Sequence, residues 1–208
     1  MTERTLFACL MELYDAGRCR GQARVAGEKT PEHLSEVPVL DGWFPKARFI
    51  HTFRDPRAIY ASQLRRVRDG RWGVKTRLTR IPAAIVDPAL APIEALRTTV
   101  AWLRAARLHR RYRRRLGERY LLVRYEDLVT DPERELRRIC DFLGVSFDPS
   151  MIAEIDVVGS SFSAARHEGS GFDEERATRW RQEIPRLGLS WFRVVAGREL
   201  RRFGYPPR

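Results

Sequence analysis

ARFIHTFRDPR (residues 47–57) is the stretch that decides the fold of this 208-residue chain. Its apolar part, residues 47–53, predicts a β-strand. Asp55 and Pro56 then predict the start of a helix, because aspartate caps helices and proline suits their first turn. This order places Arg54 at the carboxyl end of a strand, directly before a helix.

Arg54, together with Ser62 and Arg66 one turn apart on the predicted helix, is a candidate phosphate site. In open α/β sheets, ligands bind beyond the carboxyl ends of the strands, where helix N-termini offer N–H groups to an anion. A guanidinium there adds charge-assisted hydrogen bonds of about 1.5–3 kcal/mol each. From these residues alone, a capped strand-turn-helix with a solvated basic face is the alternative interpretation.

The longer segment FPKARFIHTFRDPRAIYAS (residues 44–62) resembles the 3′-phosphate-binding segment of the sulfotransferases that use 3′-phosphoadenosine-5′-phosphosulfate (PAPS). In that family, an arginine at the strand end and a serine eight residues later hold the 3′-phosphate. The resemblance therefore implies this role for Arg54 and Ser62, and it makes Arg66 a second basic contact.

Three further segments resemble the same family in the same order along the chain. GEKTP (residues 27–31) resembles an element near the transferred sulfuryl group, which implies a catalytic role for Lys29. VRYEDL (residues 123–128) resembles the segment whose tyrosine, here Tyr125, approaches the nucleotide. Arg179, which precedes a tryptophan, resembles a closing-segment residue that contacts the cofactor.

The resemblance implies an α/β fold of the P-loop-NTPase-like type, with three α/β/α layers and a mostly parallel sheet, as a single domain over residues 1–208. It also implies transfer of a sulfuryl group from PAPS to a hydroxyl or amine, with the bisphosphate PAP as product and no metal required. Small molecules, carbohydrates and peptides all remain as acceptor classes.

The family's loop for the 5′-phosphosulfate, a Pro-Arg/Lys-Ser-Gly-Thr-Thr pattern, has no counterpart in residues 1–27. We therefore expect the first strand and this loop to be missing, together with the carboxylate base that usually follows them. Two hypotheses result: an N-terminally shortened sulfotransferase, and a remnant or binding module that still recognises PAP. A basic polyanion-binding protein is a third.

The formal charge of +12 comes almost wholly from arginine, since lysine occurs only at positions 29, 46 and 75. Such a balance favours anionic partners: a nucleotide, an acidic acceptor or nucleic acid. The densest arginine run, residues 104–115, overlaps apolar residues at near-helical spacing and predicts a solvated helix face. Nucleic-acid binding is not favoured, because recognised motifs and interleaved aromatic residues are lacking.

Helices are predicted over residues 6–14, around 54–67 and around 96–115, with a second strand at 120–123. The stretch between the first helix and Pro38 is predicted to be irregular. Residues 70–92, which contain several prolines, predict a loop or broken helices that could form an acceptor-binding lid.

Beyond the second strand, a further helix is predicted to begin at Thr130 or at Asp131 and to end at Gly144, with Cys140 in its core. Residues 159–171 predict a polar loop able to fold over a nucleotide. The last predicted element is an amphipathic helix from Trp191 to Phe203.

The start of the sequence lacks a secretory signal pattern, and no apolar run is long enough to span a bilayer, so a cytoplasmic location is expected. The odd number of cysteines (Cys9, Cys19, Cys140) suggests neither a disulfide framework nor a zinc site. None of the four histidines has an adjacent nucleophile, so no base is assigned. The oligomeric state stays open, since a sheet without its opening strand would expose an edge that invites a partner, such as a second copy.

Overall fold

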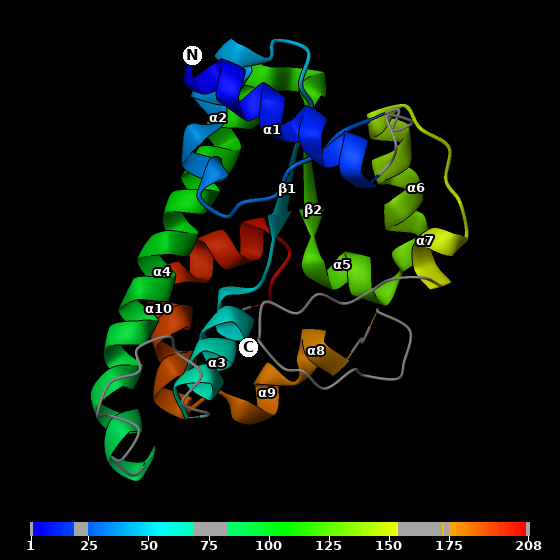
Figure 1. Ribbon diagram of the computed structural model, residues 1–208. Coiled ribbons are helices and arrows are strands. Elements are labelled where there is room, and N and C mark those ends of the chain that lie inside the picture. The colour runs from blue at the N-terminus through cyan, green and yellow to red at the C-terminus, as the bar shows by residue number, and fades with distance from the viewer. Residues whose placement is uncertain (1, 19–24, 69–82, 154–171, 173–174, 207–208) are drawn as a thin grey trace.

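Two short parallel strands, β1 (Phe49–Phe53) and β2 (Tyr120–Arg124), lie at the centre of the computed structural model (Figure 1). The structure describes residues 2–18, 25–68, 83–153, 172 and 175–206. The strands pair in register from Phe49 opposite Tyr120 to Phe53 opposite Arg124. The segments that follow the two strands therefore emerge next to each other at the same edge of the sheet.

Helices surround this pair of strands, with α4 and α10 on one side and α6 on the other (Figure 1). In chain order they are α1 (Glu3–Arg18), α2 (His33–Trp43), α3 (Pro56–Arg68), α4 (Ala83–Leu116), α5 (Tyr125–Thr130), α6 (Pro132–Leu143), α7 (Ser150–Ala153), α8 (Glu175–Thr178), α9 (Trp180–Glu183) and α10 (Arg186–Arg202). A 3₁₀ turn, Gly117–Arg119, joins α4 to β2. The predicted α/β class with a parallel sheet is confirmed.

The main core lies where α3, α4 and α10 pack against β1. On α10, Phe192, Ala196 and Leu200 recur every four residues and are almost fully buried, which is the spacing that one helix face requires. The aromatic ring of Phe53 packs on Phe203, with ring centroids 4.4 Å apart. This core fixes the carboxyl end of β1 against three helices.

The α6 helix is capped by Asp131, the second of the two predicted starting residues. The Asp131 carboxylate accepts a hydrogen bond from the Arg134 N–H at 3.3 Å, whereas Thr130 is the last residue of α5. Gly144 ends the helix with φ +73°, a left-handed conformation that glycine adopts without strain. Cys140 is buried, as predicted, and is not disulfide-bonded.

The prediction of an irregular stretch between the first helix and Pro38 was wrong in part: residues 25–32 contain no helix or strand, but α2 starts at His33 and contains Pro38. A proline at this position cannot donate to the carbonyl four residues earlier, that of Leu34. The Tyr112 hydroxyl donates to this carbonyl instead, at 2.9 Å. The neighbouring Val37 is buried against α4, so tertiary packing offsets the loss of the helical hydrogen bond that the proline cannot donate.

The expected loop or broken helices over residues 70–92 are also corrected in part, because α4 starts at Ala83 and passes through Pro88 and Pro92 without a break. Residues 70–82 and the polar loop at 159–171 lie outside the described residues. The other predicted helices are confirmed, although Trp191 and Val195 of α10 stay 37% and 44% exposed. Among the described residues, none of the helices combines the length and the apolar character needed to span a membrane.

Candidate functional site at the strand ends

Arg54 and Tyr125 follow β1 and β2 directly, and the register of the sheet brings them together. The guanidinium carbon of Arg54 lies 4.1 Å from the centroid of the Tyr125 ring. The backbone of Arg54 is also held, because its carbonyl accepts a hydrogen bond from the Trp102 indole N–H at 2.9 Å. A guanidinium stacked on an aromatic ring is held in a fixed orientation, and its planar N–H fork matches the geometry of oxyanions.

Asp55 caps α3, as the sequence predicted. Its carboxylate accepts the Arg57 N–H at 2.9 Å and also binds the Arg57 guanidinium, with the shortest contact at 2.7 Å. Both side chains are almost fully buried, at 3% and 2% exposure for the two residues. The N–H group of Arg57 is thus used within the protein and is not offered to a ligand.

Glu126 links the two strand ends to the C-terminal segment. One of its carboxylate oxygens accepts the Asp55 N–H at 2.9 Å, and the other accepts the Tyr205 hydroxyl at 2.8 Å. Burial raises the pKa of the Glu126 carboxyl above its ordinary value of 4.5, although these two hydrogen bonds act in the opposite direction. Burial, followed by the charge of Glu126, likewise raises the pKa of the Tyr205 hydroxyl.

The C-terminal segment is held by two further contacts. Arg57 donates to the carbonyl of Pro206 at 2.7 Å, and the Arg124 guanidinium lies 4.6 Å from the Tyr205 ring centroid. Gly204, with φ +75°, makes the turn that delivers Tyr205, and a Cβ at this glycine would lie 3.0 Å from the Arg124 guanidinium. Sequence reasoning missed this linkage. Its only sequence signal is a glycine directly before an aromatic residue.

Ser62 and Arg66 lie half-buried on α3, one helical turn apart. Arg179 is the residue before α9, and α9 packs on α3 because the buried Trp180 contacts Ala58 and Ala61. The Arg57 guanidinium lies 4.4 Å from the Trp180 ring centroid. The candidates Ser62, Arg66 and Arg179 are thus carried by two helices that pack on each other.

Lys29 lies on a different segment from the residues of this group. It is exposed in the segment between α1 and α2, and in the part of the chain that the structure describes no hydrogen bond or ion pair joins it to the other candidate residues. Its neighbours Glu28 and His33 form an ion-pair contact of 2.5 Å at the start of α2. The predicted catalytic role of Lys29 stays a prediction.

His51, Tyr120 and His109 form a hydrogen-bonded cluster that sequence reasoning did not find. The Tyr120 hydroxyl lies 2.7 Å from His51 Nδ1 and 3.1 Å from His109 Nδ1. Burial, and then the nearby His109, lowers the pKa of His51 to about 4. Burial, and then Arg113 and Arg110, also lowers the pKa of His109. These histidines are therefore neutral at pH 7 and structural in their contacts.

The arrangement at the strand ends can bind an anion without a metal ion. Two carboxylates lie at the strand ends with Arg54, but Asp55 is neutralised by Arg57, and Glu126 accepts hydrogen bonds from the Asp55 N–H and the Tyr205 hydroxyl. Within the described ranges, no cluster of histidine, cysteine or carboxylate side chains could hold a metal ion. The site therefore offers cations and an aromatic ring to its ligand.

Comparisons with known proteins point in one direction. The profile of the family described as "Sulfotransferase family" matches residues 2–149. Human carbohydrate sulfotransferase 6 is 30% identical over 180 residues, which cover 82% of this chain and 44% of that protein. The Mycobacterium tuberculosis omega-hydroxy-beta-dihydromenaquinone-9 sulfotransferase Stf3 is 30% identical over 151 residues, covering 69% of this chain and 33% of that protein. The chain thus spans less than half the length of these two relatives.

Two solved structures have a similar fold. The sulfotransferase domain of the Synechococcus PCC 7002 olefin synthase superimposes with a TM-score of 0.56 and 26% identity, over 90% of this chain and 64% of that chain. The sulfotransferase domain from the curacin biosynthetic pathway gives a TM-score of 0.52 at 18% identity, over 90% and 68% of the two chains, and supports the fold alone.

Proposed function

This chain belongs to the sulfotransferase family, and we propose that it takes part in transfer of a sulfuryl group from PAPS to a hydroxyl or amine of an acceptor. Family membership does not by itself establish this activity, because the chain spans less than half the length of its named relatives. The names of the carbohydrate sulfotransferases among them make a sugar hydroxyl the first acceptor class to test.

The observation that carries the proposal is the stacking of Arg54 on Tyr125, at 4.1 Å, beyond the ends of two parallel strands. In this proposal, Arg54 binds the 3′-phosphate of the donor, and Ser62 and Arg66 complete the phosphate contacts from α3. Tyr125 both orients the Arg54 guanidinium and offers its ring to the nucleotide. A planar cation fixed in advance loses less conformational freedom when it binds an oxyanion.

The surrounding residues fit an anionic donor. The bidentate Asp55–Arg57 pair is buried, so its carboxylate does not repel a phosphate placed beside Arg54. Arg179, at the start of α9, supplies another positive charge over α3. PAPS, when bound, supplies the activated sulfuryl group, and Lys29 would stabilise the charge on its oxygens.

A PAP-binding module without transferase activity is the second candidate function. It is favoured by the exposed position of Lys29, which has no hydrogen bond or ion pair to the strand-end residues among the described parts of the chain. Turnover of PAPS with a sugar acceptor separates the two candidates, since only the transferase releases PAP.

Both candidate functions require that the protein binds PAP, and calorimetric titration with PAP tests this binding. We expect Arg54→Gln to raise the Kd for PAP at least about tenfold, because one charge-assisted hydrogen bond contributes about 1.5–3 kcal/mol. ADP, which lacks the 3′-phosphate, should bind the wild-type protein more weakly than PAP.

Arg114→Gln is the matched control, since Arg114 is an exposed arginine of α4 and its removal changes the net charge equally. Equal Kd values for PAP in the two variants would contradict the assignment of Arg54, because the effect would then reflect net charge alone.

A further inference from the structure

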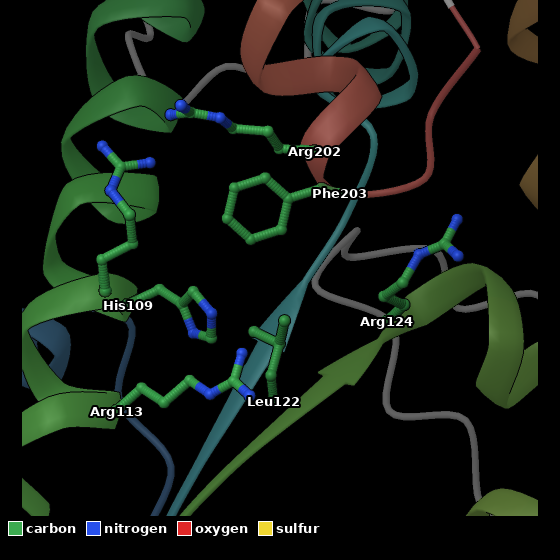
Figure 2. A pocket seen from close by; sticks show the side chains of 7 residues that line it. His109, Arg113, Leu122, Arg124, Arg202 and Phe203 are labelled. Carbon is green, nitrogen blue, oxygen red and sulfur yellow. The ribbon is translucent and has the colours of Figure 1, made fainter.

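A second basic site lies on the side of the sheet that faces α4 and α10. It is a pocket of about 320 Å³ whose lining comes from α4, β2 and the C-terminal end of α10 (Figure 2). Four of its lining residues are arginines: Arg110, Arg113, Arg124 and Arg202. None of the residues that we assign to the donor site lines this pocket.

The arginines of this pocket outnumber the carboxylates that neutralise them. A single carboxylate, Glu199, pairs with both Arg110 and Arg202, the second contact being 2.7 Å. Arg124 pairs with Asp127 at 3.4 Å. Within the described residues, no carboxylate lies within ion-pair distance of Arg113. The pocket therefore carries an excess of about two positive charges, and a concave wall of one charge sign concentrates anions.

The remaining walls are apolar or neutral. Figure 2 shows the Phe203 ring between Arg202 and Arg124, and Arg113 extending from α4 toward Leu122 on β2. His109 also lines the pocket, and its lowered pKa keeps it neutral at pH 7, so that it adds hydrogen-bonding capacity without charge. The arginines suit the anionic end of a ligand, and the aromatic ring and the leucine beside them suit its carbon skeleton.

Its size argues against a long polyanion as the ligand. Pockets that enclose small molecules measure about 300–1,000 Å³, and this pocket is at the lower end of that range. A nucleic-acid backbone would instead require an extended row of cations along an exposed groove.

We propose that this pocket binds a small organic sulfate or phosphate ester, with the oxyanion held by Arg113 and the carbon skeleton packed against Phe203 and Leu122. The site is separate from the donor site and goes beyond the proposed transfer reaction. It would give the protein a second ligand that carries an ester of the kind a sulfotransferase makes or meets.

The test is calorimetric titration of the full chain with glucose 6-sulfate, glucose 6-phosphate, inorganic sulfate and glucose at low ionic strength. We expect at least one of the two esters to bind saturably and more tightly than inorganic sulfate, while glucose alone gives no binding. Arg113→Gln should weaken ester binding at least about tenfold.

The matched control is Arg114→Gln, since Arg114 is an exposed arginine next to Arg113 that does not line the pocket. It should leave ester binding within about twofold of the wild type. Equal losses in the control and pocket variants would overturn the proposal, and so would inorganic sulfate that binds as tightly as both esters. Thermal unfolding of each variant identifies a loss of fold, and Arg113→Gln removes no ion pair seen among the described residues.

The same variants separate this proposal from the proposed function. Arg54→Gln should leave ester binding unchanged, and Arg113→Gln should leave PAP binding unchanged. If PAP binding is lost with Arg113→Gln and retained with Arg54→Gln, PAP occupies the arginine pocket, and the assignment of a separate ester site is wrong.

Discussion

Glu126 is the residue at which the two strand ends and the C-terminal segment meet. Its two carboxylate oxygens accept hydrogen bonds from Asp55 and from Tyr205, which lie far apart in the sequence. Burial disfavours the charged form, which is why its pKa is raised. A group of this kind stabilises the folded state at low pH, and this contribution is lost as the pH rises from 4.5 through its folded pKa.

Tyr205→Phe removes one of the two donors to this buried carboxylate. We expect the free energy of unfolding at pH 7 to fall by about 1–3 kcal/mol, because a buried charged acceptor is left underpaired. Since the variant further raises the pKa of Glu126, its deficit should grow as the pH increases from 4.5 toward 7. Urea unfolding at several pH values measures both effects.

Tyr112→Phe is the control for this experiment. Its hydroxyl is also engaged, but with the neutral carbonyl of Leu34 at 2.9 Å. The cost of Tyr112→Phe should therefore vary little over the same pH range. A Tyr205→Phe deficit that is equally constant would show that the charge of Glu126 is not involved.

His51 has the opposite effect on how the stability of the folded state depends on pH. Its pKa is lowered from 6.5 to about 4 in the folded protein, so the unfolded chain binds a proton that the folded chain does not. Stability is thus present above pH 6.5 and is lost as the pH falls toward 4, by roughly 3 kcal/mol for this shift. His109 acts in the same direction.

We expect His51→Gln to reduce this acid-induced loss, as measured by urea unfolding between pH 8 and 4. The comparison at pH 8, where both histidines are neutral, gives the packing cost of the substitution by itself. An unchanged pH dependence in the variant would show that His51 is not the group that takes up the proton.

At the scale of elements, α10 holds two glycines that have opposite packing environments. A Cβ at Gly188 would lie 2.8 Å from the Tyr60 ring on α3, whereas a Cβ at Gly197 would meet only the flexible Arg201 guanidinium at 4.0 Å. Gly188 therefore allows α10 to approach α3, and Gly197 has no such role.

Alanine at the two positions should consequently have opposite effects. Gly188→Ala should lower the free energy of unfolding by about 1–3 kcal/mol through overpacking. Gly197→Ala should raise it by up to about 0.5–1 kcal/mol, because alanine is the better helix former. Chemical denaturation of both variants is the measurement, and a stabilised Gly188→Ala protein would contradict the close approach to Tyr60.

The elements also show what sequence reasoning could achieve. Both strands, the cap at Asp55 and the end of α6 at Gly144 depend on local chemistry, and the structure confirms them. The passage of α2 through Pro38 could not be predicted, because it depends on a hydroxyl donated by Tyr112 from a distant helix.

The candidate site likewise has one part that sequence reasoning could predict and another that it could not. The sequence placed Arg54 and Tyr125 each at the end of a strand, and the register of the sheet, which the sequence did not predict, brings the two together. The link from Glu126 to Tyr205 and the histidine cluster around Tyr120 join residues far apart in the sequence, so no local pattern announces them.

At the scale of the whole molecule, the charge of +12 predicts weak, unspecific attraction to polyanions. Binding to duplex DNA should therefore fall steeply between 50 and 200 mM salt, by about 10³–10⁵ if 6–10 phosphates are contacted. At low salt, Arg113→Gln and Arg114→Gln should weaken it equally. Fluorescence anisotropy with a labelled duplex measures this, and salt-resistant binding would instead favour a nucleic-acid-binding function.

The tethering of Tyr205 and Pro206 to the strand ends also sets an order of assembly. The hydrogen bonds to Glu126 and Arg57 span sequence separations of 79 and 149 residues. During synthesis, Arg54 and Tyr125 leave the ribosome well before Tyr205 does. Both strand ends are therefore present in the nascent chain before the hydrogen bonds to Tyr205 and Pro206 can form. The proposed donor site is consequently among the last parts of the described fold to mature, because a ribosome that stalls before Tyr205 would leave a nascent chain that carries both strand ends but lacks the segment that links them.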